Sequence, residues 1–214
     1  MKKNITLKMI VASLLLVFLC PVSVLAQKTE KQINKDVKTL KKELKKEKME
    51  FVSSGLGIDS ELYNYFEKFY SGNYEPISGT SKGRNLNILK QTALNNAQNL
   101  YAQQINGKIK GAVANITKID ANNSAEEMDK TVAAFTKEVE ANVGGIIKVY
   151  YCTYKEADNG IKEFNAYCLI DKKAEEKFIK SALESSIQET KLTIEQAQSI
   201  TKFVSDELLK AESK

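Results

Sequence analysis

The feature that most constrains the fold is a pair of β-rich runs between Ile146 and Asp171, separated by Asp158, Asn159 and Gly160. Such runs around an Asn-Gly pair are a strong signal for a β-hairpin. The segments on either side instead repeat apolar residues every three or four positions, as amphipathic helices do. The sequence therefore predicts an α+β domain in which several long helices cover one face of a small sheet of about three strands.

The longest helical pattern runs from Leu86 to Ile116. Gly107 and Gly111 interrupt it, and we expect a kink or a close backbone crossing there, because glycine weakens a helix interior. All predicted helices and strands after residue 52 are expected to form a single domain over 53–214 with two helices at its C-terminal end. The other helices are expected from Asp59, from Ser124, over 172–188 and from Thr193.

The third strand is expected over Ile77–Thr80, where the preceding Pro76 favours an edge position or a strand entrance. The sequence ISGTSKGRNLN continues into a helix that begins near Arg84. It lacks the GxxxxGK[ST] order of a phosphate-binding loop, and neighbouring Ser and Lys side chains rarely point at one another. A turn is therefore predicted, with a helix cap supplied by Thr80, Ser81 or Asn85.

The N-terminus has the pattern of a secretory signal peptide. Three lysines precede an apolar run from Met9 to Cys20. This run is shorter than a membrane span, and small residues follow it up to Ala26. We expect cleavage after Ala26 and a location in the periplasm or cell envelope. Lipid anchoring at Cys20 is disfavoured, because Leu19 stands where lipoprotein precursors carry a small residue.

The mature chain is expected to be almost neutral. The whole chain has 32 basic and 27 acidic residues. Removing residues 1–26 takes away Lys2, Lys3 and Lys8, so 29 basic residues remain against 27 acidic ones. Because an exported chain also lacks access to nucleic acid, no nucleic-acid partner is expected.

Residues 27–52 form a lysine-rich N-terminal segment, with nine lysines and four acids over 28–48. Apolar residues spaced by four, three and four predict an amphipathic helix with one narrow apolar seam. Either this helix lies on the domain with a solvated outer face, or that face contacts a partner or an anionic envelope surface. The seam consists of Ile33, Val37, Leu40 and Leu44, and the candidate contact surface of Lys35, Lys38, Lys42 and Lys45.

Most enzyme mechanisms lack their residue types here. The sequence has no histidine and three cysteines, of which Cys20 lies in the predicted signal peptide. This removes Ser-His and Cys-His nucleophiles, histidine-ligated zinc and cysteine-rich metal clusters. Adjacent acids such as Glu126 and Glu127 are typical of solvated helix faces. We therefore predict no enzyme activity, no catalytic residue, no cofactor and no metal site.

The other two cysteines, Cys152 and Cys168, lie on the two arms of the predicted hairpin. A five-residue loop over 158–162 places them opposite one another and permits a disulfide. A two-residue loop over 159–160 places them on opposite faces, because a register shift of one residue moves each side chain of a strand to the other face of the sheet. Buried free thiols and a structural disulfide both stay open.

Three segments together resemble a known family. They are YEPISGTSKG at Tyr74–Gly83, ALNNAQNLYAQQI at Ala93–Ile105 and the hairpin YYCTYKEADNGIKEFNAYCLID at Tyr150–Asp171. Their order, over residues 74–183, resembles the small exported envelope proteins related to the Lpp-twenty lipoproteins and to the N-terminal domain of flagellar assembly protein T. The resemblance implies a compact α+β envelope protein with no agreed catalytic residues, so no functional residue is carried over.

These observations predict a non-enzymatic exported protein that acts through contacts with a protein or with the envelope surface. The alternative is a periplasmic module that binds a small molecule or a glycan, at the sheet face or near Gly107 and Gly111. The expected partner is an unidentified protein or envelope component. Peripheral membrane contact is compatible with this prediction, whereas no transmembrane helix is expected in the mature chain.

Overall fold

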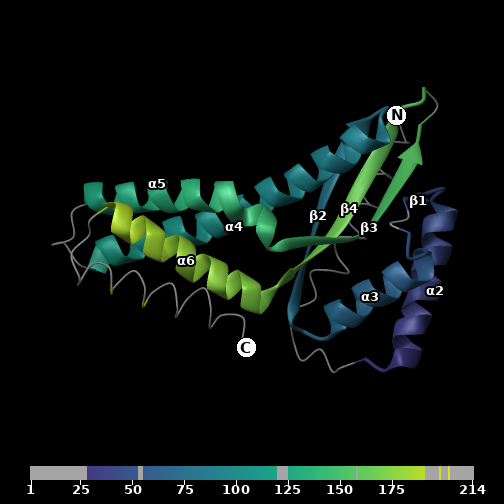
Figure 1. Cartoon of the computed structure of the whole chain (residues 1–214), viewed down its shortest axis with the longest axis horizontal. Coiled ribbons are helices and arrows are strands. Elements are labelled where there is room, and N and C mark those ends of the chain that lie inside the picture. Colours follow the sequence, from purple (N-terminus) through teal and green to yellow (C-terminus); the bar gives the residue numbers. More distant parts are fainter. Residues whose placement is uncertain are drawn as a thin grey trace.

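The computed structural model describes residues 28–52, 55–119, 125–157 and 159–190, together with residues 198 and 202. It confirms the α+β class, with helices packed on a four-stranded antiparallel sheet (Figure 1). The predicted number of about three strands is too low, because strand β1 (Glu50–Val52) comes from the segment assigned to the N-terminal helix. The predicted signal peptide, the cap at Ser124 and the helix from Thr193 lie outside the described residues.

The sheet has the strand order β1-β3-β4-β2. Strands β3 (Ile147–Glu156) and β4 (Lys162–Asp171) form the predicted hairpin. Strand β2 (Tyr74–Gly83) pairs antiparallel with β4 along its ten residues. The edge position of β2 was predicted from Pro76, which has no N–H to offer a neighbouring strand.

The turn predicted after Thr80 is wrong, because β2 continues through Ser81 to Gly83. The Ser81 hydroxyl is buried and donates to the carbonyl oxygen of Leu89 at 2.7 Å. Helix α4 (Leu86–Ile119) then begins after Asn85, one of the predicted caps. The Asn85 Oδ1 accepts backbone N–H groups of the first turn at 3.0 and 3.3 Å.

The hairpin has a register that neither predicted loop gives. Residues 157–161 separate the two strands, so that Cys152 lies opposite Ala166. A β-bulge beside Tyr150 shifts the register in the middle of β3. As a result the successive residues Tyr150 and Tyr151 both pack toward the same side of the sheet, in one aromatic cluster.

One face of the sheet is covered by α4, which continues past the sheet and forms a helical end with α5 (Ala125–Asn142) and α6 (Lys172–Thr190) (Figure 1). Helix α4 lies along β2, and α5 packs against both α4 and α6. The closest approach is at Gly79, where an added Cβ would lie 1.8 Å from the carbonyl oxygen of Ala93. A side chain at this position would therefore push α4 off the sheet.

No close crossing occurs at the predicted place in α4. An added Cβ at Gly107 or Gly111 would meet nothing within 4 Å. The helix continues through both glycines, and the neighbouring Ile105 and Ile109 are buried. Among the described residues, no helix combines the length and the apolar character needed to cross a membrane.

The opposite face of the sheet is covered by α2 (Glu30–Lys46) and α3 (Ile58–Tyr70) (Figure 1). The expectation that helices cover one face is therefore wrong, and the lysine-rich helix is part of a second core. Helix α3 contacts the strands, and α2 packs on α3. The buried members of this core are Ile33, Val37, Leu62, Tyr65, Tyr151 and Leu169.

Candidate contact surface

Helix α2 has well-defined ends. At its start, the backbone N–H of Thr29 donates to Oε1 of Gln32 at 2.9 Å, which is half of a capping box. At its end, Met49 donates its backbone N–H to the carbonyl oxygen of Leu44 at 2.8 Å, across Lys48, whose φ is 56°. This left-handed residue closes a Schellman-type end, so the helix cannot continue toward β1.

The apolar seam of α2 fixes the helix on α3. Ile33, Val37 and Leu44 of the predicted seam are buried, and Leu40 is half-buried. The seam prediction is therefore confirmed. Burial of these side chains also determines the direction in which the rest of α2 points, because residues half a turn away must face solvent.

A hydrogen bond on one flank of α2 and an ion pair on the other link this helix to α3. Lys28 Nζ and the Tyr70 hydroxyl each donate to Asp36 Oδ2 at 2.9 Å, and Lys28 lies 3.9 Å from the centroid of the Tyr70 ring. Burial would raise the pKa of Asp36, but these hydrogen bonds outweigh it and hold the pKa below its ordinary value. On the other side, Lys41 contacts Asp59 at 2.7 Å. The helix is thus attached at two points besides its seam.

The outward side of α2 is a row of lysines, which we call the lysine face. At 100° per residue its members fall within a sector of about 100°, opposite the seam, along about 22 Å of helix. All are exposed, and the three acids of α2, together with Glu47 just after it, lie outside the sector. None of these lysines forms an ion pair within the described parts of the chain. They are Lys31, Lys35, Lys38, Lys42, Lys45 and Lys46.

The structure places all four predicted contact residues, Lys35, Lys38, Lys42 and Lys45, on this face. The sequence reasoning missed Lys31 and Lys46, although the helical period that selected the other four also includes these two. It could not distinguish the lysine face from Lys28 and Lys41, which form ion pairs with Asp36 of α2 and Asp59 of α3. Asp59 is 18 residues from Lys41, so only the fold brings that pair together.

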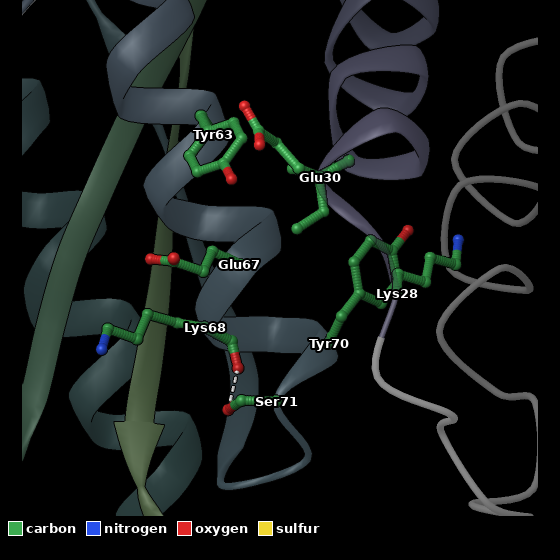
Figure 2. A pocket seen from close by; sticks show the side chains of 8 residues that line it. Lys28, Glu30, Tyr63, Glu67, Lys68, Tyr70 and Ser71 are labelled. Atoms are coloured by element: carbon green, nitrogen blue, oxygen red, sulfur yellow. Dashed lines mark hydrogen bonds between the residues drawn. The ribbon is translucent and has the colours of Figure 1, made fainter.

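A pocket of about 350 Å³ lies beside the start of α2, between this helix and α3. In Figure 2, Glu30 extends from α2 toward Tyr63 and Glu67 of α3, and Lys68 and Ser71 lie further along α3. Partial burial, followed by the charges of Glu30 and Glu67, raises the pKa of Tyr63. The pocket combines aromatic rings with charges of both signs.

The tyrosines of α3 have different roles. Leu62, Phe66 and Phe69 share one face of α3 at helical spacing, and the tyrosines stand between and beside them. Tyr65 is in fact the most buried aromatic residue of α3, with its ring 5.1 Å from that of Tyr151. The spacing of 62, 65, 66 and 69 is helical throughout, so the pattern could have identified it.

Cys152 and Cys168 are free, buried thiols on the same face of the hairpin. They are diagonal neighbours, since Cys152 pairs with Ala166 and Cys168 with Val149. Diagonal Cβ atoms lie about 7 Å apart, beyond the roughly 4 Å of a disulfide. Of the two alternatives that the sequence left open, the structure has the buried free thiols, and the direct pairing that a loop over 158–162 would give is absent. Burial raises the pKa of Cys152 to about 11 and that of Cys168 to about 12, which keeps both thiols protonated at neutral pH.

No family model, curated protein or solved structure matches this chain. The resemblance to the exported envelope family over 74–183 therefore stays a prediction. The α+β fold rests on the structure alone, and the choice of a functional surface rests on the geometry of α2 and α3.

Proposed function

We propose that this protein is a non-enzymatic, exported component of the periplasm or cell envelope that acts through contacts made by its lysine face. The proposal is supported by a difference between two groups of lysines in and beside α2. Lys28 and Lys41 form ion pairs with acids within the fold. The six lysines of the outer face have no such partners among the described residues and point into solvent, where an anionic partner would meet them.

A row of six like charges on one helix lowers the stability of a folded protein unless a bound partner of opposite charge offsets the repulsion. Neighbouring lysines at spacings of three and four repel one another by a few tenths of a kcal/mol per pair. The six exposed lysines of the lysine face therefore weaken the helix and do not serve its stability. A contact with an anionic partner would offset this repulsion.

The proposal is tested by capturing partners of α2 in intact cells. A photo-reactive residue at exposed Asn34 on α2 would be activated in the unaltered protein and in a variant with Lys35, Lys38, Lys42 and Lys45 changed to Gln. Substitution is preferable to deletion of 27–51, because deletion would uncover the core that Ile33 and Val37 cover.

A matched control changes four exposed lysines on the other helices to Gln, which keeps the same net charge. We expect capture of a defined component by the unaltered and control proteins, and its loss in the lysine-face variant. Equal capture by all three would contradict the proposal. The control positions are Lys108, Lys110, Lys137 and Lys177.

A second candidate function is binding of a small molecule or glycan in the pocket between α2 and α3. Tyr63 and Tyr70 offer ring surfaces for a sugar, and Glu30 and Glu67 offer hydrogen-bond acceptors. Thermal stabilisation by a soluble sugar, lost on Tyr63→Ala, would favour this function, because a ligand that binds only the folded state raises its stability.

A further inference from the structure

We propose that the lysine face docks this protein on the surface of an anionic phospholipid bilayer. This inference rests on the proposed function and names what occupies the contact surface. It commits to a lipid surface, and a soluble polyanion or a protein partner would overturn it.

The shape of the lysine face suits the surface of a bilayer, where separate acidic head groups lie in one plane. The six lysines follow one ridge of a helix for about 22 Å, and all of them are exposed among the residues that the structure describes. Each ammonium group is a compact, strongly hydrated charge without the planar fork of arginine, and Arg84, at the start of α4, is the only arginine of the chain. Acidic head groups spread over a bilayer match such a row, and clusters of about four to eight basic residues are typical of it.

The composition of the face disfavours a protein partner. Specific protein interfaces are enriched in tyrosine, tryptophan, phenylalanine and arginine at their centre and depleted in lysine. The exposed sector of α2 contains lysines with Asn34 and Thr39, and no aromatic residue. The aromatic side chains of this half of the molecule lie elsewhere, with Tyr65 and Tyr151 between α3 and the sheet and Tyr63 and Tyr70 beside the pocket between α2 and α3.

The contact would be electrostatic and would not involve insertion. An amphipathic helix enters a bilayer with its apolar face. Here Ile33, Val37 and Leu44 are buried against α3 and are unavailable to lipid. The hydrogen bond from Tyr70 to Asp36 and the ion pair between Lys41 and Asp59 hold the helix in that orientation. Docking should therefore reverse in high salt, where exposed charges are screened.

The fold also sets the orientation on the membrane. Helix α2 lies at one end of the long axis of the molecule, and the helical end formed by α4, α5 and α6 lies at the other (Figure 1). Contact through the lysine face would hold that helical end away from the lipid.

The test is cosedimentation of the protein, in the form that expressing cells process, with vesicles of phosphatidylcholine alone or with phosphatidylglycerol added. Neutral vesicles reveal any attachment through apolar groups. The unaltered protein, the lysine-face variant with four Gln and the control variant with four Gln on α4, α5 and α6 are compared at low and high salt. We expect binding to the anionic vesicles by the unaltered and control proteins, with a loss of about a hundredfold in the lysine-face variant. Circular dichroism of each variant establishes that all three are folded.

A fluorophore attached at Thr39→Cys on α2 or at Asp129→Cys on α5 reports the orientation. A quencher in the head-group layer should reduce emission from position 39 and leave position 129 unchanged. Equal quenching at both positions, or equal vesicle binding by the two four-Gln variants, would overturn the inference. Binding to soluble heparin without binding to anionic vesicles would do the same.

The two proposals fail in distinguishable ways. If vesicles are not bound but capture in cells still depends on the lysine face, the proposed function stands with another occupant and the lipid inference falls. If neither depends on these lysines, both fall.

Discussion

The two faces of the sheet are covered in opposite ways. On the α4 face, small residues allow backbone to approach backbone, with Ala93 and Ala97 fully buried over Gly79. On the α3 face, aromatic rings fill the space, as where Tyr65 meets Tyr151 at an interplanar angle of 89°. The first face therefore packs through small residues, and the second packs through large aromatic ones.

This difference separates the part that holds the fold from the part that can meet a partner. The α4 face extends into the contiguous core of α5 and α6. The α3 face ends at α2, which is attached by a narrow seam, by the hydrogen bond between Tyr70 and Asp36, and by the partly exposed ion pair between Lys41 and Asp59. Exposed ion pairs contribute about 0 to 1 kcal/mol each. We therefore expect α2 to open at lower free energy than α4.

The largest expected effect is that of Gly79→Ala. Its Cβ would overlap the carbonyl oxygen of Ala93 and lie 2.7 Å from the backbone nitrogen of Ala97. Backbone cannot rotate away as a side chain can, so unfolding free energy should fall by about 4 kcal/mol or more. Thermal or urea unfolding measures this directly.

Gly107→Ala is the matched control, because an added Cβ there meets nothing within 4 Å. Alanine is the better helix former, so this change should stabilise the protein by about 1 kcal/mol. A tolerated Gly79→Ala would show that α4 does not lie on β2 as closely as the structure has it.

The second effect compares one isoleucine from each core. Ile109 on α4 is 1% exposed and Ile33 on α2 is 5% exposed. We expect Ile109→Ala to cost about 3 to 4 kcal/mol and Ile33→Ala about 2 kcal/mol, because a site at the edge can relax more fully. Hydrogen exchange should show faster exchange throughout the molecule for the first change and mainly in α2 for the second.

Equal losses for the two changes, with exchange raised everywhere in both, would break the comparison. The protein would then have one cooperative unit in which α2 is as firmly held as α4.

The class of the fold and its hairpin were predictable because they depend on local periodicity. The alternating runs around Asn159 and Gly160 and the repeat along α4 carry their signal within a few turns or residues. The length of β2, the strand β1 and the bulge at Tyr150 depend on pairing with segments far along the chain. The apolar seam of α2 could be predicted, but its packing on α3 could not. Apolar spacing shows which face of a helix is buried, and it does not show which element covers that face.

The candidate surface was predictable to a similar extent. Four of the six lysines of the lysine face were named from spacing, and the helix period would have added Lys31 and Lys46. The roles of Lys28 and Lys41 required the positions of Asp36 and Asp59 in space. The geometry of Cys152 and Cys168 stayed open in the sequence because it depends on the hairpin loop, where moving the loop by one residue changes every opposing pair.

The third effect concerns Asp36, which joins α2 to α3. Its pKa is lower in the folded state than its ordinary value, so the carboxylate stabilises the fold above that ordinary value. The stabilisation is lost as the pH falls through the lowered folded pKa. Asp36→Asn should therefore cost up to about 1 kcal/mol at neutral pH and almost nothing near a pH of about 2.

Unfolding by urea at the two pH values measures the gap between the proteins. Asp59→Asn is the control, because the Asp59 side chain is 73% exposed and its ion pair should contribute less. A gap for Asp36→Asn that does not shrink in acid would show that the side chain acts through shape or neutral hydrogen bonds and not through its charge.

The smallest expected effect is a gain in stability at the end of α2. Lys48 has a φ of 56°, a conformation that costs an L-residue about 1 kcal/mol and that glycine adopts freely. Lys48→Gly should therefore stabilise the protein by about 0.5 kcal/mol after the greater chain entropy of glycine is deducted. Lys46→Gly, two residues earlier and inside the helix, should instead cost about 1 kcal/mol. If α2 opens independently of the sheet, hydrogen exchange will slow in α2 alone for the first change and quicken there for the second. An equal response in α4 would mean that the two faces of the sheet share one unfolding transition.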